Sequence, residues 1–222
     1  VAAFRKLYLS ECDIILTSSY LNANQVLKTR KGQVLVSYCH TPARYYWSHY
    51  AQYRKQPGYG KLDPIIRLLI PLFVPHQRKL DYQAAQRVDL FIANSTETRA
   101  RIKKYYGKPA TVIHPPVDTK LFTPARERGN HYVTVGRQLP YKRYDLAVAA
   151  CTQLGLPLLV FGNGPQHEHL KQIAGPTVEF RTQRFGNASD SELQKALNTA
   201  KGFIYPAEED FGIVSVEALA AG

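Results

Sequence analysis

Short apolar runs rich in β-branched residues recur through both halves of this sequence, and helix-like stretches separate them. Runs without polar alternation are typical of parallel strands that are covered on both faces. The expected strands lie at residues 13–17, 33–39, 90–94 and 110–113 in the first half, and at residues 132–136, 158–161, 178–180 and 202–205 in the second. This pattern predicts an α/β fold with doubly wound parallel sheets.

A proline-rich stretch of mixed charge divides the two halves. Residues 115–130 read PPVDTKLFTPARERGN, with three prolines, and such a composition is typical of a linker between domains. We therefore expect an N-terminal domain at residues 1–120 and a C-terminal domain at residues 131–222.

Capping residues predict the start of two helices. Ser95 begins the string STET and precedes a helical stretch that stops at Gly107. Ser189 begins SDSE, which has the spacing of a capping box. Each is expected to open a helix that follows a strand.

The segment at residues 44–86 mixes aromatic with basic residues. One interpretation is a long surface loop followed by a core helix whose Arg and Lys stems cover apolar surface. The other is a face for the acceptor or for an anionic membrane, since basic residues with Trp and Tyr suit lipid interfaces. Pro71 and Pro75 argue against one straight helix through the segment.

The composition fits a globular protein with anionic partners. The chain has 222 residues, is 45% hydrophobic and carries 29 basic against 17 acidic residues, a formal charge of +12. Cys12, Cys39 and Cys151 are scattered, so neither a disulfide framework nor a structural metal is expected, and a reducing cytosol fits best. No apolar run is long enough for a transmembrane helix, and the N-terminus lacks a signal-peptide pattern.

The two ends of the sequence suggest a piece of a longer protein. The chain contains no methionine, including at position 1. It stops at Gly222, where a helix end would normally lead to another strand. We therefore expect truncation at both ends, with both domains incomplete.

The C-terminal string EEDFGIVSVEALAAG places Glu209 and Glu217 eight positions apart around the expected start of a helix, near Gly212 or Ile213. The N–H groups at a helix start, together with its dipole, form an anion site. A diphosphate could bind there, while Glu209 accepts hydroxyls of a sugar and Glu217 those of a ribose. Alternatively, the acidic residues only charge the first helical turn and the apolar residues are ordinary core.

Other catalytic motifs are not found. The sequence has no G-x-S-x-G elbow, no HExxH string, no P-loop and no D-x-D string that would hold a diphosphate through a metal. The Gly-x-Gly turn at Gly162 follows a strand but lacks the third glycine of a dinucleotide fingerprint. We interpret it as room for backbone beside a nucleotide.

Three strings together resemble family 4 glycosyltransferases, which are retaining enzymes with two facing Rossmann-like domains, the GT-B fold. These are the C-terminal string, HYVTVGRQLPYKRYD at residues 131–145, and VSYCHTPARYYW at residues 36–47. The resemblance implies that Arg137 and Lys142 bind the donor diphosphate without a metal or other cofactor, and that His40 and Glu209 are catalytic residues at the transferred sugar. The remaining donor-binding residues that we assign are Gly162, Phe211, Gly212, Ile213, Val214 and Glu217.

The same resemblance implies a reaction and its partners. The enzyme would transfer a hexose from a nucleoside diphosphate sugar to a glycan or lipid-linked acceptor in polysaccharide or glycolipid assembly. The strings around residues 40–47 and 112–118 look most like mannosyltransferases, which favours GDP-mannose as the donor. The expected location is the cytoplasm, with peripheral contact at the inner face of the membrane, and no nucleic-acid partner is expected.

Two alternative functions stay open at this point. One is another GT-B enzyme, such as a nucleotide-sugar epimerase. The other is a non-catalytic basic module that binds nucleic acid or an anionic membrane, which the charge of +12 would favour. Salt dependence distinguishes nucleic-acid binding from a nucleotide-sugar pocket, since binding through many phosphates weakens steeply as salt is added.

Overall fold

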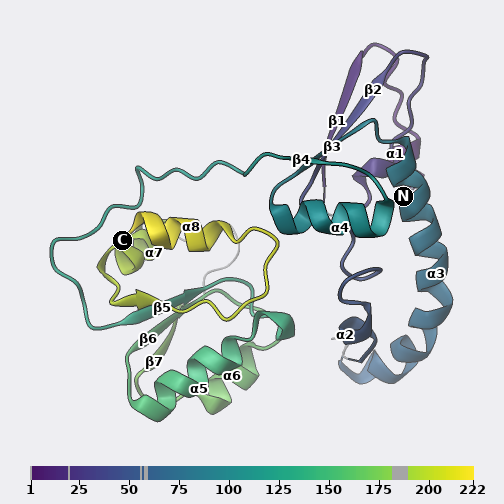
Figure 1. Cartoon of the computed structure of the whole chain (residues 1–222). Helices are drawn as coiled ribbons and strands as arrows, with labels where there is room; N and C mark the ends of the chain where they lie inside the picture. The colour runs from purple at the N-terminus through teal and green to yellow at the C-terminus, as the bar shows by residue number, and fades with distance from the viewer. Residues whose placement is uncertain (1, 20, 56, 58–59, 182–189) are drawn as a thin grey trace. The chain divides into compact units, whose positions relative to one another are not determined.

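The computed structural model describes residues 2–19, 21–55, 57, 60–181 and 190–222. The chain forms two compact units, Val1–Pro115 and Pro116–Gly222 (Figure 1). Each unit contains one four-stranded parallel sheet with helices packed against it. The α/β prediction with parallel sheets is confirmed.

The first sheet has the strand order β1-β2-β3-β4, and all its pairings are parallel. The sequence placed each strand to within two residues at either end. Parallel pairing brings the carboxyl ends of the strands to one edge of the sheet. The bounds are β1 Ile14–Ser19, β2 Val34–Cys39, β3 Leu90–Ala93 and β4 Thr111–Val112.

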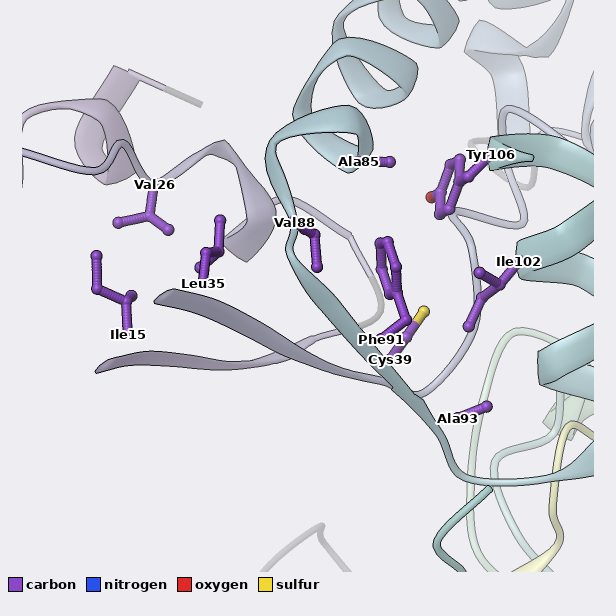
Figure 2. Close-up of a cluster of buried hydrophobic side chains, with 10 residues drawn as sticks. All are labelled: Ile15, Val26, Leu35, Cys39, Ala85, Val88, Phe91, Ala93, Ile102 and Tyr106. Atoms are coloured by element: carbon purple, nitrogen blue, oxygen red, sulfur yellow. The ribbon is translucent and has the colours of Figure 1, made fainter. Parts of the chain in front are cut away.

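Helices α3 and α4 pack on the sheet through an apolar cluster. Figure 2 shows Leu35 and Phe91 from two strands meeting Val88, just after α3, and Ile102 and Tyr106 from α4. Ser95 caps α4 as predicted, since its Oγ accepts the Thr98 N–H at 3.0 Å. The helical elements are α1 Ala2–Arg5, η1 Ala23–Gln25, α2 Tyr50–Lys55, η2 Gly60–Leu62, α3 Asp63–Arg87 and α4 Thr96–Tyr106.

Within the described residues, only one face of the first sheet is covered. Ile15 and Leu35 are buried in the cluster, whereas Ile14 and Leu16 on the opposite face of β1 are 64% and 67% exposed. Leu90 of β3 is likewise 59% exposed. The expected coverage on both faces is therefore not seen for this sheet.

Helix α3 passes through both prolines but is not straight, in agreement with the expectation drawn from them. The helix is continuous over Asp63–Arg87 with Pro71 and Pro75 inside it. Each proline removes one backbone hydrogen bond, and Figure 1 shows the helix bending along its N-terminal half. Burial of the apolar Val74 side chain between the two prolines favours the helix in this position.

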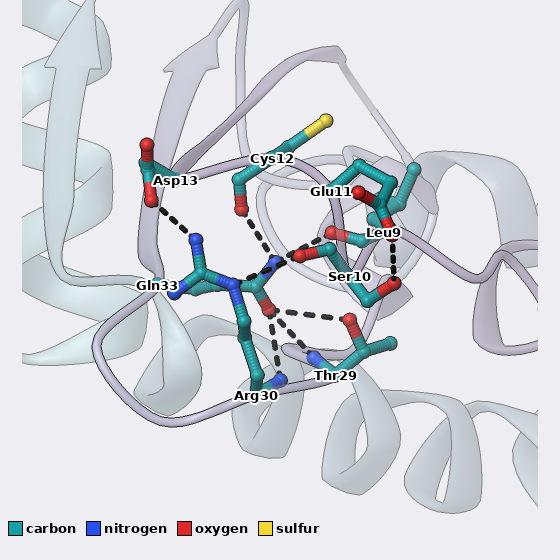
Figure 3. Close-up of polar contacts among 8 residues, drawn as sticks. All are labelled: Leu9, Ser10, Glu11, Cys12, Asp13, Thr29, Arg30 and Gln33. Atoms are coloured by element: carbon teal, nitrogen blue, oxygen red, sulfur yellow. Dashed lines mark hydrogen bonds and ion pairs between the residues drawn. The ribbon is translucent and has the colours of Figure 1, made fainter.

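One buried amide fixes the segment before β1 against the turn before β2. The Gln33 side chain is 4% exposed, and its Nε2 donates to the Leu9 and Cys12 carbonyls at 2.6 and 2.7 Å. Its Oε1 accepts the N–H groups of Thr29 and Arg30 at 2.7 and 3.1 Å (Figure 3). Two loops thus satisfy their backbone groups through one side chain.

The second sheet has the order β7-β6-β5-β8, again fully parallel. Its strands agree with the predicted ones to within two residues. They are β5 Tyr132–Val135, β6 Leu158–Phe161, β7 Val178–Arg181 and β8 Gly202–Phe203. The helical elements are η3 Pro140–Lys142, α5 Tyr144–Leu154, α6 His167–Ile173, α7 Asp190–Thr199 and α8 Ile213–Ala220. The capping box predicted at Ser189 lies outside the described residues.

Helices cover both faces of the second sheet (Figure 1). On one face, Leu158 and Val160 of β6 pack against α5 and α6. On the other, Phe161 and the partly buried Leu159 pack against α7 and α8. This unit therefore has the three layers expected of a doubly wound sheet.

Candidate functional site

The loop that follows β5 begins at a glycine that no other residue could replace without a clash. A Cβ on Gly136 would lie 2.3 Å from the Tyr144 hydroxyl, which donates to the Val135 carbonyl at 2.6 Å. The chain then passes through the exposed Arg137 and enters η3, which ends at Lys142. Both predicted cations thus lie just beyond the carboxyl end of a central strand, where parallel α/β sheets bind ligands.

Lys142 and Glu209 form an ion pair. The Lys142 Nζ contacts the Glu209 Oε1, and the two side chains are only 14% and 18% exposed. The sequence assigned both residues to the donor site but gave them separate roles, the lysine on phosphate and the glutamate on sugar. The structure brings the two side chains together, and a pair this shielded leaves an uncompensated charge if one partner is removed.

Helix α8 begins where the sequence predicted. Gly212 precedes it with φ of +78°, a conformation that favours glycine, and provides no side-chain cap for the first N–H groups. A Cβ there would approach the Tyr205 hydroxyl to 3.4 Å. Phe211 is half-buried before the helix, and Ile213 is 43% exposed at its first position.

The other predicted residues of α8 divide between core and surface. Val214 packs into the apolar cluster beneath the second sheet, so its side chain has a structural role. Glu217 lies just over one turn into the helix and is half-buried. The helix start, Glu217 and the Lys142–Glu209 pair all belong to the second unit.

The Gly-x-Gly turn is packed by protein backbone. A Cβ on Gly162 would lie 2.2 Å from the Gly136 carbonyl oxygen, and one on Gly164 would lie 2.6 Å from that of Gln138. The Gln138 amide is fully buried, donates to the Gly162 carbonyl at 3.0 Å and pairs with His167 Nδ1 at 2.8 Å. The room that the glycines leave is thus occupied by the neighbouring strand-end loop, and sequence reasoning missed Gln138 and His167.

His40 is the predicted site residue of the first unit. It follows β2, and its Nε2 lies 3.0 Å from Ser18 Oγ near the end of β1. The ring meets Tyr38 edge-on with centroids 5.3 Å apart, while the His40 carbonyl accepts the Thr98 hydroxyl at 3.1 Å. Ser18 was not predicted, although parallel strands that end at one sheet edge make such a neighbour reasonable.

Two further features of a donor site are a metal centre and contacts to the nucleotide base. Among the described residues, no group of three or more His, Cys, Asp or Glu side chains is placed to hold a metal ion. The family resemblance also implies that the segment around Arg184 and Phe185 lies near the nucleotide base, and these two residues lie outside the described residues.

The two α/β units in tandem, each with a parallel sheet, match the GT-B class of fold. Residues 1–121 match Glycosyltransferase Family 4, and residues 119–222 match the family described as Glycosyl transferases group 1. The chain therefore belongs to glycosyltransferase family 4.

Solved structures agree in fold. Sucrose-phosphate synthase from Thermosynechococcus elongatus is 19% identical with a TM-score of 0.68, and the match covers 100% of this chain and 56% of that one. The lipopolysaccharide outer core galactosyltransferase WaaB is 17% identical with a TM-score of 0.59, covering 94% and 54%. An alpha-glucosyltransferase in complex with UDP and DNA is 14% identical with a TM-score of 0.56, covering 96% and 60%. The chain thus spans little more than half the length of these proteins.

No curated protein matches the sequence.

Proposed function

We propose that this chain carries the donor site of a retaining hexosyltransferase that uses a nucleoside diphosphate sugar, with GDP-mannose as the favoured donor. The acceptor would be a glycan or lipid-linked hydroxyl in polysaccharide or glycolipid assembly. The observation that carries the proposal is the shielded Lys142–Glu209 pair in the same unit as the start of α8, where the N-cap residue is a glycine. Family membership supports glycosyl transfer in general.

In the proposed reaction, the acceptor oxygen bonds to the anomeric carbon as the bond from that carbon to the phosphate oxygen breaks. The acceptor proton passes to the leaving phosphate, so no side chain is assigned as a general base. Arg137, Lys142 and the N–H groups of α8 would stabilise the negative charge that grows on the diphosphate, in place of a metal ion. His40 and Glu209 would contact the transferred sugar, and Glu217 the ribose.

The ion pair sets a requirement for donor binding. The Lys142 ammonium is already paired with the Glu209 carboxylate. A donor phosphate must therefore either share the ammonium with Glu209 or replace Glu209 as its partner. We infer that Glu209 keeps Lys142 in place in the free protein and accepts sugar hydroxyls when the diphosphate takes over the ammonium. Glu209 would then oppose the binding of free GDP slightly and favour that of the whole donor.

Calorimetric titration with GDP-mannose, UDP-glucose, GDP and UDP tests this proposal. Lys142→Ala is expected to weaken nucleoside diphosphate binding by about 1.5–3 kcal/mol, the usual size of a hydrogen bond to a charged group. Glu209→Gln is expected to bind the free diphosphate as tightly as the wild type or more tightly, yet to lose sugar transfer. The double variant is expected to be non-additive because the residues are in contact.

Lys171→Ala provides the matched control, since Lys171 forms an exposed pair with Glu168 at 3.9 Å in the same unit. It is expected to leave every titration unchanged. Equal loss of free diphosphate binding in Glu209→Gln and Lys142→Ala would contradict the roles given to the pair. Binding of none of the four ligands, together with salt-sensitive binding of duplex DNA, would favour the basic-module alternative.

A further inference from the structure

Helix α3 carries a row of exposed apolar side chains that lie away from the sheet of the first unit. Figure 1 shows α2 beside the N-terminal end of α3 and both extending away from strands β1–β4. The exposed apolar side chains recur at helical spacing on α3, and we call them the apolar stripe. The stripe comprises Ile65 (58% exposed), Leu68 (74%), Leu69 (39%), Leu72 (71%) and Phe73 (61%).

The apolar stripe faces away from the core of its own unit. At about 3.6 residues per turn, its five positions fall on one side of the helix, opposite the buried Val74 and Asp81. The large apolar side chains in this row are not part of the apolar cluster that packs on the sheet. Such a row, rather than scattered exposed residues, marks an interaction surface.

Basic side chains adjoin the stripe at a pocket between α2 and the start of α3. The pocket has a volume of about 570 Å³, and its lining includes Arg54, Lys55, Arg67 and Leu68, with no acidic residue. Leu68 belongs to both features, so the pocket and the stripe form one surface. Over residues 44–80 the sequence holds seven Lys and Arg residues against one acidic residue, Asp63.

Aromatic stacking holds α2 against α3. The Arg78 guanidinium lies over the Tyr50 ring at 4.8 Å and over the Trp47 ring at 5.4 Å. Its Nε donates to the Tyr46 carbonyl. These contacts hold the first residue of α2, and the segment just before it, against the helix that carries the stripe.

We propose that α2 and the N-terminal half of α3 bind the surface of an anionic lipid bilayer, with the apolar stripe entering the headgroup boundary and Arg54 and Lys55 of α2 facing lipid phosphates. Interfacial helices combine these two features. No described helix is long and apolar enough to cross the bilayer. The inference does not depend on the proposed donor site.

Charge argues for a bilayer over other occupants. A second copy would bring two basic pockets together, and their like charges would repel. Nucleic acid would satisfy the cations but would leave the five large side chains of the stripe in water. An anionic bilayer offers phosphates to the basic side chains and an apolar interior to the stripe.

Co-sedimentation with lipid vesicles tests the proposal. The wild-type chain is expected to bind vesicles of phosphatidylcholine mixed with phosphatidylserine and to bind phosphatidylcholine alone weakly. The variant Leu68→Ser/Leu72→Ser is expected to lose at least tenfold in affinity. Arg54→Gln/Lys55→Gln is expected to lose about thirtyfold for the anionic vesicles, roughly fivefold for each charge removed, with little change on neutral ones.

Each variant has a matched control in the same unit. Ile14→Ser/Leu16→Ser removes two equally exposed apolar side chains from the sheet, and Lys103→Gln/Lys104→Gln removes an adjacent basic pair from α4. Both controls are expected to bind like the wild type. All four substituted pairs are exposed, so unchanged circular dichroism will show that folding is intact.

Three results would overturn the proposal. One is the absence of binding to anionic vesicles. Another is equal loss of binding in the stripe variant and its sheet control. The third is a dimer of the wild-type chain that Leu68→Ser/Leu72→Ser dissociates while vesicle binding persists, since this would make a second copy the occupant of the stripe.

Discussion

Both sheets of this chain are built from short, largely apolar parallel strands, but the two sheets differ in how many faces are buried. In the second sheet, successive residues of β6 face opposite helical layers and are packed on both sides. In the first, Ile15 is 6% exposed and its neighbour Ile14 is 64% exposed. Both sheets have four parallel strands, so topology does not account for the difference. What differs is whether a second layer of helices lies within the described chain.

The comparison shows how far the sequence of an apolar strand predicts the burial of its two faces. Such a strand is compatible with burial on both faces, yet burial itself depends on segments that are distant in sequence. Strand β1 and strand β6 would be given the same environment from their own residues alone. The burial of each strand is therefore a property of the surrounding unit and not of the strand.

The largest expected effect lies in the second sheet, where both faces are packed. Leu158→Ala and Phe161→Ala remove buried side chains from opposite faces, and each is expected to cost about 3–5 kcal/mol in the free energy of unfolding. Urea unfolding monitored by circular dichroism measures this cost. Leu154→Ala, at a position 68% exposed on α5, is the control and is expected to change little. A small effect for either buried position would show that one face of this sheet is less well packed than we describe.

The first sheet offers a matched pair of adjacent isoleucines. Ile15→Ala is expected to cost about 2–4 kcal/mol, whereas Ile14→Ala is expected to stay within about 0.5 kcal/mol. Urea titrations at several protein concentrations would measure both. Equal costs would contradict the open face, and a cost for Ile14→Ala that grows with protein concentration would show that association covers it.

The sequence allowed most of the fold to be predicted because local signals agreed with packing. All eight predicted strands are present, and the helix from Ser95 to Gly107 has both of its predicted caps. Local signals say less where contacts distant in sequence decide the outcome. Pro71 and Pro75 predicted that no straight helix runs through their segment, and α3 is bent there, but they did not predict that the helix would stay continuous, with Val74 buried between them.

The candidate site shows the same division. Gly212 and the start of α8 follow from local sequence, since a glycine before an apolar-periodic stretch marks a helix boundary. The pairing of Lys142 with Glu209 joins residues 67 positions apart and has no local signature. The same is true of the contact between Ser18 and His40, which depends on strand register. The functional roles of these residues stay predictions that the titrations above can test.

The smallest expected effect concerns a buried charge that distinguishes the two units. In the second unit the buried Tyr144 hydroxyl donates to a backbone carbonyl, whereas in the first the buried Tyr106 hydroxyl donates to the Asp81 carboxylate at 2.8 Å. Trp47 Nε1 donates to the same carboxylate at 2.7 Å. Burial raises the pKa of Asp81 above its usual value, and these two hydrogen bonds only partly offset the effect.

A raised carboxyl pKa means that the folded state binds the proton more tightly than the unfolded chain does. Asp81 therefore makes stability fall as pH rises from about 4 through the raised pKa, and the loss persists at neutral pH. Asp81→Asn is expected to remove this decline and to converge with the wild type below about pH 4. Asp89→Asn is the opposite control, because the Leu35 N–H and Lys28 lower the pKa of Asp89 and its contribution is lost as pH falls. Urea midpoints measured across pH should thus change slope in opposite directions, and slopes that change in the same direction would show that the Asp81 carboxyl is not the buried charge described here.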